Sequence, residues 1–327
     1  MDWIGFVVGI LCVIVAVLII ASFYFYNVAI KRNKKQFLKN NKDLEQPDHP
    51  SDDVEVVEIT EEHIQPTPVF DADWVNSQSF ETWQLTSEDG LKLVGYYIPA
   101  KIKTNKTVLL AHGYTSQGKD MGGFAKFYYE RLGYNVFMPD SRGHGASEGN
   151  YIGFGWIDRK DYLLWIKEVI NKIGNNAQIV LHGISMGGAA VMMISGEKLP
   201  EQVKVIIEDC GYTSVEDELK YQLKRMYKLP SFPILQTTSL LTKVRAGYHF
   251  HEASSLKQLE NNNTPMLFIH GDADTFVPSE MVWQVYDACK AEKDVLIIEG
   301  AAHGMAFSVG RSIYEKKVTE FIANYIN

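Results

Sequence analysis

Six short apolar runs, rich in Val, Ile, Leu or Phe, constrain the fold of this chain more than any other feature. Helical patterns such as residues 156–173 and 279–290 lie between most of them. Strand–helix alternation of this kind predicts a mostly parallel sheet with helices on both faces. Two further segments, Glu81–Thr86 and Leu91–Ile98, flank a turn and predict a hairpin. The six runs are residues 107–111, 135–139, 178–181, 204–208, 265–269 and 294–299.

The first thirty residues have a different character. No residue from Trp3 to Ile30 is charged, and this stretch exceeds the roughly 20 apolar residues that cross a hydrocarbon core as a helix. A cleavable signal peptide is disfavoured, because the segment starts with the acidic Asp2 and lacks a small-residue cleavage pattern. We therefore expect a transmembrane anchor over residues 1–30.

A basic cluster follows this segment directly. The positive-inside rule places such a cluster on the cytoplasmic side, so we expect a cell-membrane protein with its larger part in the cytoplasm. The rule is statistical, and export of the C-terminal part stays open as the alternative. The cluster consists of Lys31, Arg32, Lys34, Lys35, Lys39 and Lys42.

Residues 43–79 hold eleven acidic residues, four prolines and no Lys or Arg. This composition is typical of a solvated tether, so we expect a basic and then acidic linker over residues 31–79. The pattern becomes globular at Phe80 and predicts one domain over residues 80–327. Its longest connection suggests a small helical lid over about residues 214–263.

Composition narrows the classes of function. The net charge of −8 disfavours a nucleic-acid partner, because phosphate contacts need clustered Lys and Arg. Cys12, Cys210 and Cys289 are far apart and odd in number, so neither a disulfide framework nor a zinc site is indicated. We expect no metal and no organic cofactor, and the oligomeric state is not fixed by the sequence.

The sequence Gly183-Ile-Ser185-Met-Gly187 lies between a predicted strand and a predicted helix. A serine hydroxyl is a weak nucleophile and must be exposed on a tight turn, where glycines two residues before and after relieve crowding. The helix that follows favours negative charge at its N-terminus. Ser185 is therefore the candidate nucleophile, although the bare pattern also arises by chance.

Such a nucleophile requires a histidine and an acid. His303 follows the last predicted strand, whereas the other strand-end histidines each precede a glycine inside the sheet pattern. Asp274 follows the preceding strand, and the order serine, aspartate, histidine fits this architecture. Asp272 and Asp209 also lie at strand ends, so spacing alone leaves the choice of acid open.

An oxyanion hole is the remaining requirement, because the tetrahedral intermediate carries negative charge. One donor is expected from the residue after the nucleophile and the other from the loop after the first parallel-type strand. These positions nominate the backbone N–H groups of Met186 and Tyr114. His112, in the same loop, is interpreted as a residue that shapes the loop.

These motifs occur in the order in which the α/β-hydrolase superfamily has them, and the chain resembles that superfamily over roughly residues 80–327. It is similar to single-domain bacterial hydrolases grouped with serine aminopeptidase-like and esterase members. The resemblance implies that Asp274 is the triad acid and that the loop after Asp140 shapes the fold. The matching pieces are His112–Thr115, Asp140–Gly149, Gly183–Gly188, Gly271–Pro278 and His303–Gly304.

We therefore predict a serine hydrolase that cleaves an acyl ester or thioester of a small or lipid-like substrate. A peptidase with the same triad, a non-catalytic scaffold and a lyase remain the alternatives, because one fold hosts many activities. Apolar residues between 221 and 241 suggest a hydrophobic acyl pocket, although most of them are expected to pack the lid onto the body.

Overall fold

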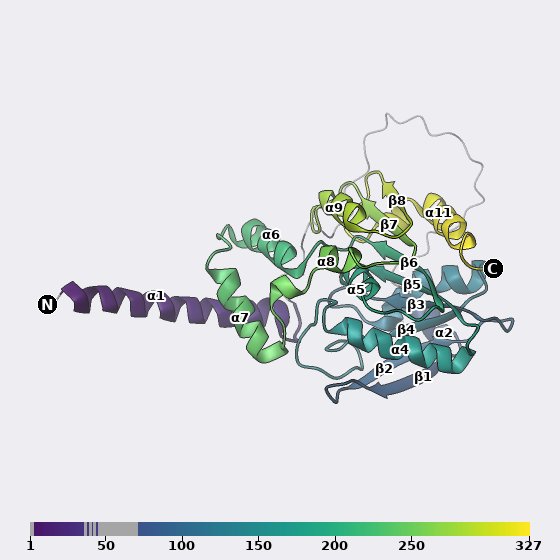
Figure 1. The fold of residues 1–327 in the computed structure, drawn as a ribbon, viewed down its shortest axis with the longest axis horizontal. Coiled ribbons are helices and arrows are strands. Elements are labelled where there is room, and N and C mark those ends of the chain that lie inside the picture. The colour runs from purple at the N-terminus through teal and green to yellow at the C-terminus, as the bar shows by residue number, and fades with distance from the viewer. Residues whose placement is uncertain (1–2, 36–37, 39–40, 42–43, 45–70) are drawn as a thin grey trace.

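The computed structural model describes residues 3–35, 38, 41, 44 and 71–327. Its body is an eight-stranded sheet in the order β1-β2-β4-β3-β5-β6-β7-β8 (Figure 1). The first pairings, β1 with β2 and β2 with β4, are antiparallel, and all the others are parallel. The predicted mostly parallel α/β fold is therefore confirmed. The strands are β1 (Glu81–Thr86), β2 (Lys92–Ile98), β3 (Lys106–Ala111), β4 (Asn135–Pro139), β5 (Gln178–Ile184), β6 (Val203–Asp209), β7 (Met266–Gly271) and β8 (Lys293–Ile298).

Helices cover both faces of this sheet and bury alternate strand residues. In β3, for example, Leu109 belongs to a buried cluster that includes residues of α4, α5 and α9, whereas Val108 belongs to a second cluster that includes residues of α2, α3 and α11. The predicted helices near 156–173 and 279–290 are present as α4 and α9. The helices of the body are α2 (Ala72–Ser77), α3 (Gly122–Lys126), α4 (Asp158–Ile173), α5 (Met186–Ser195), α8 (Ser255–Leu259), α9 (Glu280–Ala288), α10 (Ala306–Val309) and α11 (Arg311–Ala323).

The globular part begins earlier than the sequence pattern suggested. Asp71 caps α2 by accepting a hydrogen bond from the backbone N–H of Trp74 at 2.9 Å, and Trp74 and Val75 are buried in the core. This helix is too short to show a periodic pattern, so the sequence places it within the expected linker. The acidic residues of that linker between 45 and 70 lie outside the described residues.

The N-terminal helix comprises α1 (Trp3–Phe25) and a π-helical end, η1 (Tyr26–Ile30). It is long and apolar enough to cross a membrane, and most of α1 extends away from the body (Figure 1). Its end, however, is docked on the domain. Ile30 is fully buried, and its carbonyl accepts a hydrogen bond from the N–H of Ile152 at 2.7 Å. The end of the expected 1–30 anchor is therefore in contact with the domain.

Two residues of the basic cluster hold this helix end in place. The Lys35 ammonium donates hydrogen bonds to the carbonyls of Val28, Ala29 and Lys31, at 2.8, 3.1 and 2.7 Å. These carbonyls have no partners within the helix, so Lys35 caps it. Burial lowers the pKa of Lys35 to about 8. Arg32 donates to carbonyls of the loop that contains Gly145 and Ser147. The basic cluster therefore also has a structural role.

The long connection between β6 and β7 contains two lid helices, α6 (Val215–Tyr227) and α7 (Ile234–Ala246), followed by η6 (Phe250–Glu252) and α8. The lid helices lie at the end of the body from which α1 extends, and α7 contacts α1 (Figure 1). The face of α1 with reduced exposure carries Leu18, Ala21, Ser22 and Phe25. Their spacing places them on one side of the helix.

A buried arginine fixes the loop that follows β4. The guanidinium of Arg142 binds both carboxylate oxygens of Asp161 in α4, at 2.6 and 2.7 Å, and also binds the half-exposed Asp89. Asp161 and Arg142 are both almost fully buried. This bidentate pair joins the β1–β2 turn, the loop after β4 and α4.

We predict that Asp161→Ala destabilises the domain by about 3 kcal/mol, because the guanidinium cannot lose its charge and stays buried with one partner fewer. Chemical denaturation of the full chain followed by tryptophan fluorescence measures this loss. Asp287→Ala, which removes an exposed carboxylate from α9, is the matched control and should change the midpoint little. Equal midpoints for both variants would contradict the assigned role of the pair.

Candidate active site

Ser185 lies on a strained turn between β5 and α5. Its φ of 56° and ψ of −117° fall outside the regions that residues with a Cβ prefer. A Cβ on Gly183 would lie 2.1 Å from the carbonyl oxygen of Gly187, and one on Gly187 would lie 1.9 Å from that of Ala111. Both flanking positions therefore require glycine, which is the physical basis of the motif. The Ser185 N–H donates to the carbonyl of Asp209 at 2.7 Å and ties the turn to β6.

The structure brings Ser185, His303 and Asp274 together at the C-terminal edge of the sheet. The Oγ of Ser185 lies 2.8 Å from Nε2 of His303, and Nδ1 of the same ring lies 2.7 Å from Oδ2 of Asp274. The three side chains follow β5, β8 and β7, respectively. Phe276 packs against the His303 ring, with the ring centroids 4.9 Å apart. The imidazole is thereby held between the hydroxyl and the carboxylate.

Asp274 is fixed on both of its oxygens. Oδ1 accepts the backbone N–H groups of Phe276 and Val277, each at 2.9 Å, and Oδ2 also lies 3.2 Å from Nε2 of His270. Burial alone raises the pKa of Asp274, but the imidazoles of His303 and His270 outweigh burial and hold this pKa well below its usual range. The carboxylate is therefore charged at neutral pH. The sequence offered no signal for His270, which reads as the end of a buried strand.

The other two candidate acids have different partners. Asp209 is fully buried, and its Oδ2 accepts a hydrogen bond from the hydroxyl of Tyr314 at 2.9 Å. Asp272 is exposed, and its Oδ1 accepts the N–H of Gly300 at 2.7 Å. Among the three acids left open by spacing, only Asp274 is hydrogen-bonded to His303 in the described part of the chain.

Met186 and Tyr114 line the same pocket as Ser185. Met186 is the first residue of α5, where backbone N–H groups have no acceptor within the helix. Tyr114 follows β3, the neighbour of β5, and its hydroxyl donates to the carbonyl of Ala29 at 2.7 Å. His112 accepts the N–H of Ser141 through Nε2 at 3.0 Å, and its Nδ1 lies 2.8 Å from the carbonyl oxygen of Gly113. His112 thus joins two loops by backbone contacts.

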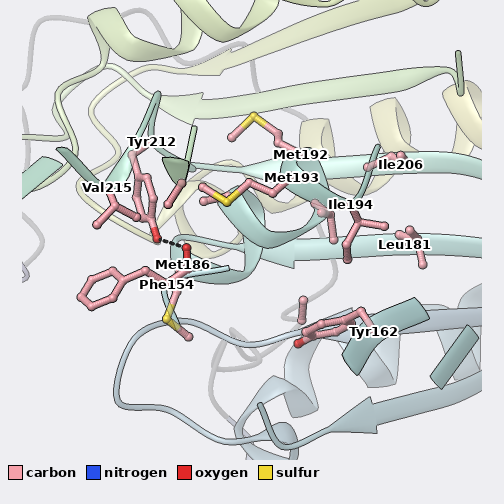
Figure 2. Close-up of a cluster of buried hydrophobic side chains, with 14 of the residues drawn as sticks. Phe154, Tyr162, Leu181, Met186, Met192, Met193, Ile194, Ile206, Tyr212 and Val215 are labelled. Atoms are coloured by element: carbon pink, nitrogen blue, oxygen red, sulfur yellow. Dashed lines mark hydrogen bonds between the residues drawn. The ribbon is translucent and has the colours of Figure 1, made fainter. Parts of the chain in front are cut away.

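A pocket opens beside Ser185, and its walls are mostly apolar. The body contributes a cluster in which Met186, Phe154 and Tyr212 lie close together (Figure 2). The Tyr212 hydroxyl donates to the carbonyl of Phe154 at 2.9 Å, as the dashed line in Figure 2 shows. Further walls come from the lid helices and the N-terminal helix: Leu219, Leu223, Met226, Tyr227, Ile234, Leu235 and Thr238, together with Phe25, Val28 and Ala29.

One buried carboxyl group lines this pocket and was missed in the sequence. Glu218 of α6 accepts a hydrogen bond from the Gln222 amide at 2.7 Å through Oε1, whereas Oε2 has no partner among the described residues. Burial raises the pKa of Glu218 to about 8. The group is thus mostly protonated at neutral pH and adds a hydrogen-bond donor to an apolar wall. In the sequence it reads as one of three acids in the first turn of a helix.

The donor atoms of Cys210, Asp274 and His303 lie within 4.8 Å of one another, which is the spacing of a metal site. Their chemistry does not fit a metal. Both ring nitrogens of His303 are already hydrogen-bonded, to Ser185 and Asp274.

The free energy of unfolding of the wild type should fall between pH about 4.5 and about 8, and we predict that Glu218→Gln makes this fall smaller. Between these two values the folded state keeps a proton that the unfolded chain releases, so the free energy of unfolding falls as the pH rises. Urea denaturation at both ends of the range measures the difference. Glu320→Gln, at an exposed position of α11, is the control and should retain the wild-type dependence. An unchanged dependence in Glu218→Gln would contradict the assigned burial.

Comparison with known proteins places the chain in a family. The prolyl oligopeptidase family matches residues 124–327. The protein YqkD of Bacillus subtilis is 29% identical over 252 residues, which cover 76% of this chain and 82% of YqkD. YfhR of Escherichia coli K12 is 28% identical over 255 residues, which cover 76% of this chain and 82% of YfhR. The membrane protein YNL320W of Saccharomyces cerevisiae is 24% identical over 218 residues, which cover 64% of this chain and 68% of YNL320W.

Two solved structures show the same fold. The Pyrococcus furiosus esterase Pf2001 has a TM-score of 0.63 and 24% identity, with 79% of this chain and 94% of the esterase covered. The acylaminoacyl peptidase of Pyrococcus horikoshii has a TM-score of 0.58 and 19% identity, with 78% of this chain and 43% of the peptidase covered. The fold, the family match and the geometry around Ser185 agree. The chain belongs to the prolyl oligopeptidase family of serine hydrolases and has the α/β-hydrolase fold.

Proposed function

We propose that Ser185, His303 and Asp274 form a catalytic triad. The observation that carries this proposal is the continuous hydrogen-bonded line from the Ser185 hydroxyl through the His303 ring to the Asp274 carboxylate, at 2.8 and 2.7 Å. His303 takes the hydroxyl proton as Ser185 attacks the acyl carbon, and later returns it to the leaving group. Asp274 is charged, so it stabilises the imidazolium that forms.

The attack moves an electron pair onto the carbonyl oxygen of the substrate. We assign stabilisation of this oxyanion to the backbone N–H groups of Met186 and Tyr114, and the N-terminus of α5, which begins at Met186, adds a favourable field. Collapse of the intermediate expels the alcohol or thiol and leaves Ser185 acylated. A water molecule, deprotonated by His303, then attacks the same carbon and releases the acid.

The substrate that fits best is an acyl ester or thioester. The pocket beside Ser185 has apolar walls with one carboxyl and one amide group, which suits a hydrocarbon chain better than a peptide backbone. A peptidase is the second candidate, because the polar pair Glu218 and Gln222 offers hydrogen bonds to an amide. A non-catalytic scaffold is disfavoured, since such a protein has no need of the strained serine turn.

We predict that a fluorophosphonate probe labels the full chain and that Ser185→Ala abolishes the labelling, because the probe reacts only with an activated serine. Asp274→Asn should lower ester hydrolysis by roughly 10⁴-fold, because it removes the charge that supports the imidazolium. Ser308→Ala, at an exposed serine of α10, is the control and should label normally. Undiminished labelling of Ser185→Ala would mean that another residue is the nucleophile.

We also propose that the N-terminal helix spans the cell membrane and that the hydrolase domain is cytoplasmic. The helix has no charged residue over 28 residues, and Lys31, Arg32, Lys34 and Lys35 follow it. Exposed apolar side chains along α1 are unfavourable in water and fit a lipid environment.

In intact cells, we therefore expect the domain to resist protease added from outside and to become digestible after permeabilisation. An immunoblot against the C-terminus of the chain measures this, because a cytoplasmic domain is shielded by the membrane. A known external protein on the same cells serves as the control for protease activity. Digestion of the domain in intact cells would reverse the proposed orientation.

A further inference from the structure

The end of the N-terminal helix forms part of the pocket beside Ser185. Phe25, Val28 and Ala29 line this pocket together with Ser185 itself. The phenol of Tyr114, whose backbone N–H is the proposed second oxyanion donor, is hydrogen-bonded to the carbonyl of Ala29. A helix that served only as a tether would not need to enter the substrate site.

The distance along the helix places the membrane close to this pocket. From Trp3 to Phe23 a helix rises about 30 Å, which is the thickness of a hydrocarbon core. Both of these aromatic side chains are exposed and suit the two interfaces of a bilayer. Val28 lies five residues beyond Phe23, which corresponds to about 8 Å along an α-helical axis. The pocket therefore begins one or two turns from the lipid.

The lid helices lie beside this part of the helix. The Tyr227 ring of α6 packs edge-on against Phe25, with the centroids 5.0 Å apart, and the Arg245 guanidinium of α7 lies 5.6 Å from the centre of the Phe23 ring. Both contacts occur where the helix would leave the hydrocarbon. The outer surface of the lid helices is consequently at the level of the lipid headgroups.

The chemistry of that outer surface fits a membrane. Phe232, Leu240 and Val244 are 73%, 59% and 78% exposed, and the last two lie one turn apart on α7. Residues 219–247 include six Lys or Arg and no Asp or Glu, although the whole chain is acidic. Exposed apolar side chains among basic ones are typical of segments that lie on anionic lipid.

We infer that the surface of the lid helices around Phe232, Leu240 and Val244 rests on the lipid bilayer, and that the pocket receives the acyl chain of a membrane amphiphile along the N-terminal helix. Phe25 and Val28 then contact the acyl chain of the substrate, so the membrane-spanning helix is also a specificity determinant. This inference rests on the proposed function and names its substrate class.

The test uses the full chain reconstituted in phosphatidylcholine vesicles that contain phosphatidylglycerol. The rate constant kcat/KM is measured for p-nitrophenyl hexadecanoate in the vesicles and for p-nitrophenyl acetate in water, and the ratio of the two is compared between variants. Fluorophosphonate labelling of Ser185 is recorded for each protein. If the wild type is not labelled, the proposed function fails; if it is labelled, the ratios test the present inference separately.

Val28→Trp places a bulky ring in the pocket and should lower the ratio roughly 10- to 100-fold, as a steric block in an apolar pocket does. Val17→Trp, at an exposed position of α1 away from the pocket, is the control and should keep the wild-type ratio. A Val28→Trp protein that labels normally and has the wild-type ratio would overturn the role of the helix in the pocket.

Val244→Glu changes the lid surface and leaves the pocket intact. It therefore tests the contact with lipid even if Val28→Trp does not fold. A carboxylate at this position opposes contact with anionic lipid and should lower the ratio by about tenfold. Ile313→Glu, at a comparably exposed position of α11, should have no effect. An unchanged ratio in Val244→Glu overturns the contact with lipid. If the wild type proves to be a dimer and this variant is a monomer with an unchanged ratio, the surface belongs to a contact with a second copy of the chain.

Discussion

The strained turn at Ser185 is the constraint on which the site depends. The backbone of this residue is held at a positive φ by close contact between Gly183 and Gly187 and by the hydrogen bond from its N–H to the carbonyl of Asp209. These contacts join β5, the start of α5 and β6, so the position of the hydroxyl is set by the sheet itself. His303 and Asp274 reach it from the loops after β8 and β7, which lie beyond β6 in the sheet. The geometry of the site is thus a consequence of strand order.

Much of this arrangement was accessible from the sequence because it rests on local patterns. Strands buried on both faces appear as apolar runs, and a turn that excludes a Cβ appears as two glycines around Ser185. The catalytic roles assigned to Ser185, His303 and Asp274 remain proposals, but the sequence did identify the three side chains that the fold brings together. The choice among the acids needed the family resemblance.

The features that the sequence did not reveal are tertiary. Glu218 looks like an ordinary acid at the start of a helix, and only the packing of α6 over the body removes it from water. His270 looks like the end of a strand, and its contact with Asp274 depends on the loop after β7. Tyr26 and Ile30 lie in a stretch whose uniform apolarity hides which residues face protein and which face lipid. The periodicity of apolar residues in a sequence indicates which face of an element is buried, but not what that face packs against.

The hydrogen bond from Tyr114 to the carbonyl of Ala29 has a practical consequence. Removal of the apolar helix Trp3–Ile30 is the direct way to make a water-soluble fragment. Here a cut after Ile30 would take away a wall of the substrate pocket, uncover the side of Tyr114 and leave Lys35 without two of the three carbonyls it caps. The water-soluble fragment would then be a different catalyst, and its substrate preferences would not describe those of the intact chain.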